Sequence, residues 1–281
     1  MLSLIRGLLA GRKRTKAARP PSRRARLRFD AMPEAVYAIG DVHGQLELLR
    51  ALEAAIAGDA EDVPGEKWMV LLGDFVDRGP DSARVLDYLA SPPAPGFTRL
   101  CLAGNHEIMM LDALEGRRSL QRWLELGGLE TLLSYGISAD DLKRVPVASA
   151  RFRHLLDSYI PEEHLDFLRD LPVAVEFPEF LLVHAGLRPG VPLDGQSDED
   201  LTLAAHDPAA DSHLHDKVVV HGHRIVDTPL LSARNINVDT GAYLTGRLTA
   251  VRLSIGKDTV FLETTVNAIG RIEAEEERAR R

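Results

Sequence analysis

The most regular feature of this chain is a short apolar run followed at once by glycine and polar side chains. The pattern occurs five times: VYAIG-DVHG at 36–44, WMVLLG-DFVDRG at 68–79, RLCLAG-NHE at 99–107, FLLV-HAG at 180–186 and KVVV-HGH at 217–223. Continuous apolar runs without alternation are typical of strands buried on both faces. The chain therefore predicts five buried strands, each ending in a polar cluster.

The segments between the first three runs have the apolar spacing of helices. Residues 44–58 place Leu46, Leu49 and Leu52 at helical intervals, and residues 80–90 begin with Pro-Asp-Ser, a common helix start. Strands that alternate with helices predict an α/β fold.

The rest of the chain departs from this alternation. Residues from about 108 to 172 form leucine-rich helical stretches joined by glycine and proline, which predicts a helical insertion. Residues 236–266 contain β-branched runs separated by glycine turns, which predicts two or three antiparallel strands. We expect one catalytic domain over residues 31–270, with tails at 1–30 and 271–281.

Composition fits a soluble globular protein, since 45% of the 281 residues are hydrophobic and 27% are charged. The formal net charge of -8 does not favour nucleic acid as a partner. The single cysteine, Cys101, excludes a disulfide within the chain and fits a reducing, cytoplasmic location.

The N-terminal segment has the opposite charge, because the first 28 residues contain ten Arg or Lys and no acidic residue. Its apolar part, LSLIRGLLA, is too short to span a membrane and contains Arg6, so stable membrane insertion is not expected. The segment predicts a disordered basic tail at 1–30, and weak contact with a membrane surface is the alternative. The acid- and arginine-rich residues 271–281 predict a charged C-terminal tail.

The polar clusters after the five strands supply metal ligands. Functional groups gather at the carboxyl ends of strands in α/β sheets, and here these ends carry Asp41, His43, Asp74, Asn105, His184, His221 and His223. Nitrogen and oxygen ligands without a thiolate are typical of a divalent-metal site. Seven candidates are too many for one ion and suit two ions that share a carboxylate. Asp41 and His43 are two residues apart, so both side chains would leave an extended segment on one side.

The motifs GDVHG, GDFVDRG, GNHE, HAG and HGH, in this order, resemble those of the calcineurin-like metallophosphoesterases. GDFVDRG with GNHE resembles more narrowly the serine/threonine protein phosphatase branch and its bacterial and phage relatives. The resemblance implies a four-layer αββα sandwich, in which two mixed β-sheets pack face to face between flanking helices. It also implies two divalent metal ions, with Mn2+ preferred and Fe, Ni, Co or Zn as alternatives.

The resemblance gives six metal ligands. They are Asp41 and His43 for the first ion, Asn105, His184 and His223 for the second, and Asp74 for both. His221 precedes the Gly-His dipeptide of the family and is expected to support the site rather than bind metal.

The resemblance also implies three catalytic residues. His106 would be the general acid, Asp77 would orient its ring, and Arg78 would bind phosphate oxygens. The implied reaction is phosphate-ester hydrolysis by in-line attack of a hydroxide that bridges the two metals. Glu107 is expected to support the site or to cap a helix.

The chain departs from the family in one place. Protein phosphatases of this branch usually have a second phosphate-binding Arg between the HAG and GH motifs, but no Arg lies between Arg188 and Arg224 here. His206, Arg188 or Arg224 are the candidates to replace it.

Three functions follow. The motifs favour a serine/threonine protein phosphatase acting on a phosphoprotein or a small phosphorylated substrate. A symmetrical diadenosine tetraphosphate hydrolase, which shares these motifs, is the alternative. A non-catalytic phosphate-binding scaffold is the third reading.

Overall fold

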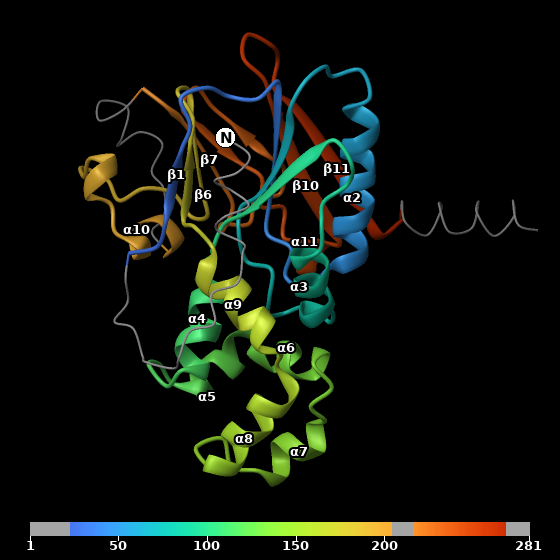
Figure 1. Ribbon diagram of the computed structural model, residues 1–281, viewed down its shortest axis with the longest axis vertical. Coiled ribbons are helices and arrows are strands. Elements are labelled where there is room, and N and C mark those ends of the chain that lie inside the picture. The colour runs from blue at the N-terminus through green and yellow to red at the C-terminus, as the bar shows by residue number, and fades with distance from the viewer. Residues whose placement is uncertain (1–22, 204–215, 268–281) are drawn as a thin grey trace, which may run out of the picture.

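The computed structural model describes residues 23–203 and 216–267 of the chain (Figure 1). The strands are β1 (Arg26–Arg28), β2 (Ala35–Ile39), β3 (Lys67–Leu71), β4 (Phe97–Cys101), β5 (Ala174–Glu176), β6 (Phe180–Val183), β7 (Val218–His221), β8 (Leu230–Leu231), β9 (Asn235–Asn237), β10 (Arg247–Leu253) and β11 (Val260–Thr265). The α-helices are α2 (Leu46–Asp59), α3 (Ser82–Ala90), α4 (Asn105–Leu114), α5 (Leu120–Trp123), α6 (Leu129–Ser134), α7 (Ala139–Arg144), α8 (Ala150–Tyr159), α9 (Glu162–Asp170), α10 (Asp198–Leu203) and α11 (Ala242–Thr245). A π-helical turn, η1 (Leu124–Gly128), joins α5 to α6, and a 3-10 turn, η2 (Leu193–Gly195), precedes α10.

The strands form two mixed sheets. A six-stranded sheet has the order β1-β5-β6-β7-β9-β8, and a five-stranded sheet has the order β11-β10-β2-β3-β4. The five apolar runs form β2, β3, β4, β6 and β7, as their sequence pattern predicts. Strand β4 is mostly half-buried rather than buried, because it lies at the edge of its sheet. Strands β2, β3 and β4 are mutually parallel, and so are β6 and β7, so the polar clusters gather at the carboxyl ends of both groups.

The two sheets pack face to face, because alternate residues of β2 enter different cores. Val36 and Ala38 pack in one apolar core with Leu182 of β6, so this core lies between the sheets. Tyr37 and Ile39 face the other way, into a core shared with the helices. Figure 1 shows α2 outside the sheet that contains β10 and β11. The predicted αββα sandwich is confirmed.

Helices α4 to α9 occupy residues 105–170, the stretch in which we expected a helical insertion from about 108 to 172. They lie below the sheets in Figure 1. Helix α4 begins earlier than the predicted insertion, so Asn105 and His106 lie in its first turn. The C-terminal strands β10 and β11 are antiparallel, whereas β9 joins the other sheet and runs parallel to β7.

The predicted N-terminal tail at 1–30 is too long, because residues 23–30 belong to the folded body. Strand β1 runs parallel to β5, and Leu27 and Phe29 pack against the core between the sheets. The Arg24 guanidinium donates to the carbonyls of Leu168 and Leu171, each at 2.9 Å, where α9 ends. The charge pattern predicts that Arg24 is exposed to solvent in a tail, but its side chain instead forms hydrogen bonds with main-chain carbonyls of the folded body.

Residues 1–22 and the predicted tail at 271–281 lie outside the described residues. In the part of the chain that is described, no helix combines the length and the apolar character needed to cross a bilayer.

Removing the Arg24 side chain should destabilise the fold. We expect Arg24→Ala to lower the free energy of unfolding by about 1–3 kcal/mol, because two buried carbonyls at the end of α9 lose their donor. Arg84→Ala is the matched control, since its side chain is 56% exposed and pairs with Asp81 at the surface, and its cost should stay below about 1 kcal/mol. Urea unfolding measures both, and equal midpoints for the two variants would contradict the role assigned to Arg24.

Candidate metal centre

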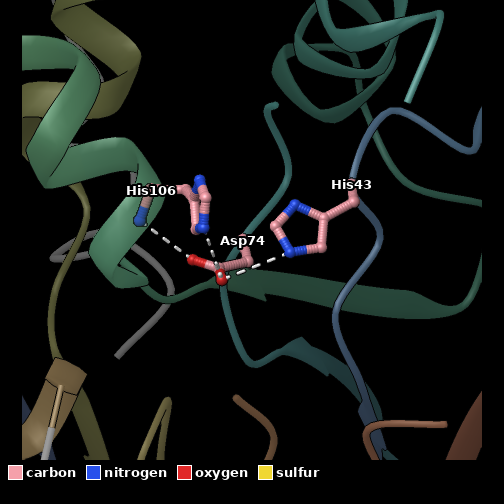
Figure 2. Close-up of side chains that lie close together, drawn as sticks. All are labelled: His43, Asp74 and His106. Atoms are coloured by element: carbon pink, nitrogen blue, oxygen red, sulfur yellow. Dashed lines mark hydrogen bonds and ion pairs between the residues drawn. The ribbon is translucent and has the colours of Figure 1, made fainter. Parts of the chain in front are cut away.

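Asp74 lies at the centre of the polar cluster, in the loop that follows β3. Its Oδ2 is 3.5 Å from Nε2 of His43 and 3.4 Å from Nε2 of His184, and its Oδ1 accepts the backbone N–H of His106 at 3.0 Å. Figure 2 shows its carboxylate between the rings of His43 and His106. Asp74 therefore occupies the position expected of a ligand shared by two ions.

The remaining predicted ligands surround His184. Its Nε2 is 3.0 Å from Oδ1 of Asn105 and 3.2 Å from Nδ1 of His223. Both carboxylate oxygens of Asp41 accept the backbone N–H of His223 at 3.2 Å, and Oδ1 of Asp41 is 3.9 Å from Nδ1 of His184. The structure thus brings all six predicted ligands into one cluster.

Two close groups of ligand atoms stand out within this cluster, each with its atoms within 4.8 Å of one another. One group contains His43, Asp74 and His106, and the other contains Asp74, His184 and His223. Among the described residues, neither group includes Asp41 or His221. His221 is buried at the end of β7.

The cluster has the chemistry of a metal site. Nδ1 of His43 donates to the Val76 carbonyl at 2.8 Å, and Nδ1 of His184 donates to the Leu72 carbonyl at 3.1 Å. These bonds direct Nε2 of each ring toward the Asp74 carboxylate, the outer-shell arrangement that orients metal-ligating histidines. Nitrogen and oxygen acceptors that converge on a buried point need a cation between them, and this donor set fits a divalent first-row metal.

The electrostatics agree with this reading. Burial lowers the pKa of His43 to about 3, and burial with the neighbouring His184 lowers that of His223 to about 4, so both rings are neutral, as ligands must be. Burial also opposes a charge on His184, but the carboxylates of Asp74 and Asp41 outweigh it and raise its pKa to about 10. The carboxylates thus favour a positive charge at the His184 ring, and Asp74 is the one that faces Nε2, where a proton or a metal ion can supply it.

The backbone of the cluster is strained. Among the described residues, the non-glycine residues with positive φ are His43 (43°), Asp74 (52°), Asp77 (71°), Arg78 (69°) and His223 (65°). All five are predicted site residues. The left-handed conformation costs about 1–2 kcal/mol for an ordinary residue, and such strain is characteristic of functional sites. It also corrects one expectation, because His43 does not continue an extended segment from Asp41.

Glu107 holds the strained loop after β3 in place. Its buried carboxylate accepts the N–H groups of Asp74 (2.8 Å), Phe75 (2.7 Å), Val76 (3.2 Å) and Gly104 (2.8 Å). Burial raises the pKa of Glu107 to about 6, while these backbone donors oppose the rise. One side chain thus ties the loop that carries Asp74 to the start of α4.

The helical segment orients the predicted acid. Oδ2 of Asp77 accepts Nδ1–H of His106 at 2.7 Å, and the same carboxylate accepts the indole N–H of Trp123 at 3.0 Å and the hydroxyl of Thr131 at 2.7 Å. Burial disfavours a charged His106 ring, but Asp74 and Asp77 raise its pKa above the ordinary value. The sequence analysis did not identify Trp123 and Thr131, because no local pattern indicates that either residue contacts Asp77, about 50 positions away.

Arg78 reaches the cluster from the same loop. Its side-chain Nη1 is 3.2 Å from Nε2 of His43, and its backbone N–H donates to the carbonyl of Gly127 at 3.0 Å. Gly127 has φ 115°, and a Cβ there would lie 2.8 Å from Cγ of Arg78, so only glycine allows this approach.

The three candidates for the missing Arg differ in position. Arg188 pairs with Asp200 at 3.4 Å, so its charge is already engaged. Arg224 is exposed and directly follows His223. His206 lies outside the described residues.

The sequence model of the calcineurin-like phosphoesterases matches residues 35–255, a range that contains the whole cluster. The chain belongs to this family. Membership confirms the resemblance seen in the motifs, and with the two close ligand groups it makes this calcineurin-like phosphoesterase a metal-binding hydrolase.

Relatives of this calcineurin-like phosphoesterase include nucleotide hydrolases. The asymmetrical bis(5'-nucleosyl)-tetraphosphatase of Halalkalibacterium halodurans is 29% identical over 235 residues, which are 76% of this chain and 88% of the relative. The symmetrical bis(5'-nucleosyl)-tetraphosphatase of Dechloromonas aromatica is 32% identical over 155 residues, which are 55% of this chain and 45% of the relative. A crystal structure of a proposed diadenosine tetraphosphatase has a TM-score of 0.58 at 21% identity, over 85% of this chain and 98% of that one. That likeness shows the fold alone.

Replacing Glu107 by glutamine should destabilise the loop after β3. The amide offers one acceptor oxygen in place of two and presents an N–H2 group to buried N–H donors, so we expect Glu107→Gln to lower the free energy of unfolding by about 2–3 kcal/mol. Glu47→Gln is the matched control, because this side chain is 52% exposed on α2, and its effect should be within about 0.5 kcal/mol. Urea unfolding of the two variants measures this difference. If the unfolding midpoint of Glu107→Gln equals that of Glu47→Gln, Glu107 does not anchor the loop.

Proposed function

We propose that the chain hydrolyses bis(5'-nucleosyl) tetraphosphates such as diadenosine tetraphosphate. The observation that carries the proposal is the match to the Halalkalibacterium halodurans tetraphosphatase, because it extends over 88% of that enzyme. The Dechloromonas aromatica relative supports the same substrate class, although the match covers less than half of its length.

The proposed metal content is two divalent ions, Mn2+ in preference to Fe, Ni, Co or Zn, held by the six ligands of the cluster. Bound there, they would polarise a phosphoryl oxygen and lower the pKa of water.

We assign phosphate binding and proton donation to two side chains of the protein. We assign Arg78 to phosphate binding, because its planar guanidinium can donate two hydrogen bonds to one phosphate. We assign His106 to proton donation, because Asp77 holds the proton on Nδ1 and leaves Nε2 to face the cluster, 4.0 Å from Oδ2 of Asp74. A protonated Nε2 can then give its proton to the departing oxygen.

A serine/threonine protein phosphatase is the second candidate function. The GDFVDRG and GNHE motifs favour it. The absence of an Arg between Arg188 and Arg224 argues against it, because a phosphate monoester offers few other groups to hold. Arg224 is the best-placed replacement, since it is exposed beside His223 while Arg188 pairs with Asp200.

A substrate panel separates these functions. With added Mn2+, we expect hydrolysis of diadenosine tetraphosphate to exceed that of a phosphoserine peptide and of an aryl phosphate. The products report the cleavage position, since ADP alone indicates symmetrical cleavage and AMP with ATP indicates asymmetrical cleavage. Phosphate release from the peptide alone would replace the proposal with the protein phosphatase. If the protein binds metal but hydrolyses none of these substrates, the result would favour the third function, a non-catalytic phosphate-binding scaffold.

Removing the proposed acid should slow the chemistry and leave the metals in place. We expect His106→Asn to lower kcat for a phosphoserine peptide by about 100-fold or more, the usual scale for losing a general acid, and kcat for diadenosine tetraphosphate by a smaller factor, because a nucleotide phosphate is the better leaving group. Metal content, measured by elemental analysis, should stay unchanged. His154→Asn, at an exposed position on α8, is the matched control and should retain full kcat. A fall in the metal content of His106→Asn would show that His106 is a ligand, as its place in the first ligand group allows.

A further inference from the structure

The side chain of Tyr243 lies against two residues of the cluster although it belongs to none of the family motifs. The Arg78 guanidinium is 4.8 Å from the centre of the Tyr243 ring, and the His43 ring meets the Tyr243 ring edge to face with centres 5.2 Å apart. Among the described residues, the Tyr243 hydroxyl makes no hydrogen bond. The ring, rather than the hydroxyl, therefore makes the contact.

The turn that carries Tyr243 is held firmly. Helix α11 is a single turn between two left-handed glycines, Gly241 (φ 70°) and Gly246 (φ 67°). The N–H of Gly241 donates to Oδ1 of Asp239 at 2.9 Å, and the Thr245 hydroxyl donates back to the Gly241 carbonyl at 3.0 Å. These bonds fix the direction in which the Tyr243 ring leaves the backbone.

The Arg78 guanidinium has few other partners. In the part of the chain that is described, no carboxylate pairs with it, and its contacts are Nε2 of His43 at 3.2 Å and the Tyr243 ring. Nε2 of His43 is also a predicted metal ligand, and one lone pair cannot serve a metal and a hydrogen bond together. The Tyr243 ring is thus the contact that remains compatible with metal binding.

We propose that Tyr243 is a positioning residue that holds Arg78 for phosphate binding. A guanidinium over an aromatic face is attracted by the ring, and its N–H groups stay free to donate to phosphate oxygens. The proposal rests on the phosphate-binding role assigned to Arg78 under the proposed function. It does not depend on which phosphate compound is the substrate, because inorganic phosphate offers the same oxygens.

Binding of inorganic phosphate to the metal-reconstituted protein, measured by calorimetry, tests this role. We expect Tyr243→Leu to raise the Kd for phosphate by about 3- to 10-fold, the range of a cation–π contact. Tyr243→Phe keeps the ring and should restore the affinity. Leu244→Ala, on the same turn with a side chain 69% exposed, is the matched control and should leave the Kd unchanged.

A double mutant separates this role from a general loosening of the site. In an Arg78→Ala background, adding Tyr243→Leu should change the phosphate Kd no further, because the contact is already lost. An equal loss in both backgrounds, or a lower metal content in Tyr243→Leu, would overturn the proposal in favour of an effect through His43. If diadenosine tetraphosphate is not hydrolysed but phosphate binding follows the expected pattern, the substrate assignment fails and the role of Tyr243 stands.

Discussion

The Glu107 carboxylate is the contact on which the arrangement of the site depends. It accepts four backbone N–H groups from two loops, and three of them belong to consecutive residues after β3. Those bonds hold Asp74 in its left-handed conformation. The left-handed residues further along the same loop have other acceptors, since the backbone N–H of Asp77 donates to the Thr131 hydroxyl at 2.8 Å and that of Arg78 donates to the Gly127 carbonyl at 3.0 Å. A buried carboxylate thus offsets the backbone strain at Asp74, the residue predicted to be shared by two metal ions.

The helical segment is part of the site and more than a cover for the sheets. Trp123 and Thr131 donate to the Asp77 carboxylate, which in turn fixes the ring of His106. The segment therefore contributes to the orientation of the His106 ring through the Asp77 side chain. A change in the packing of this segment should alter the orientation of His106 without changing a predicted metal ligand, because the Asp77 carboxylate accepts hydrogen bonds both from the segment and from His106.

The sequence predicts those features that rest on local patterns. The five strands were predictable because continuous apolar runs have few other solutions, although β4, at the edge of its sheet, is mostly half-buried rather than buried. The clustering of the candidate ligands was predictable because they lie at or just after the ends of these strands. Strand β1 was missed because the charge of its arginines hid the alternation of Leu27 and Phe29. The partners of Asp77 and the ring over Arg78 were missed for another reason. Trp123, Thr131 and Tyr243 lie far along the chain from Asp77 and Arg78, and the sequence around them does not indicate which residues they contact.

The two candidate substrate classes present different phosphates to the metal cluster. The terminal phosphate of a phosphoserine has three non-bridging oxygens, whereas each phosphate of a dinucleoside tetraphosphate has two bridging and two non-bridging oxygens. They differ also in the leaving group, because an alkoxide would need a proton from the proposed acid His106 far more than a nucleotide phosphate would. They differ also in the atoms beyond the reacting phosphate. Loss of His106 should therefore slow ester hydrolysis more than anhydride hydrolysis, if His106 is the proton donor.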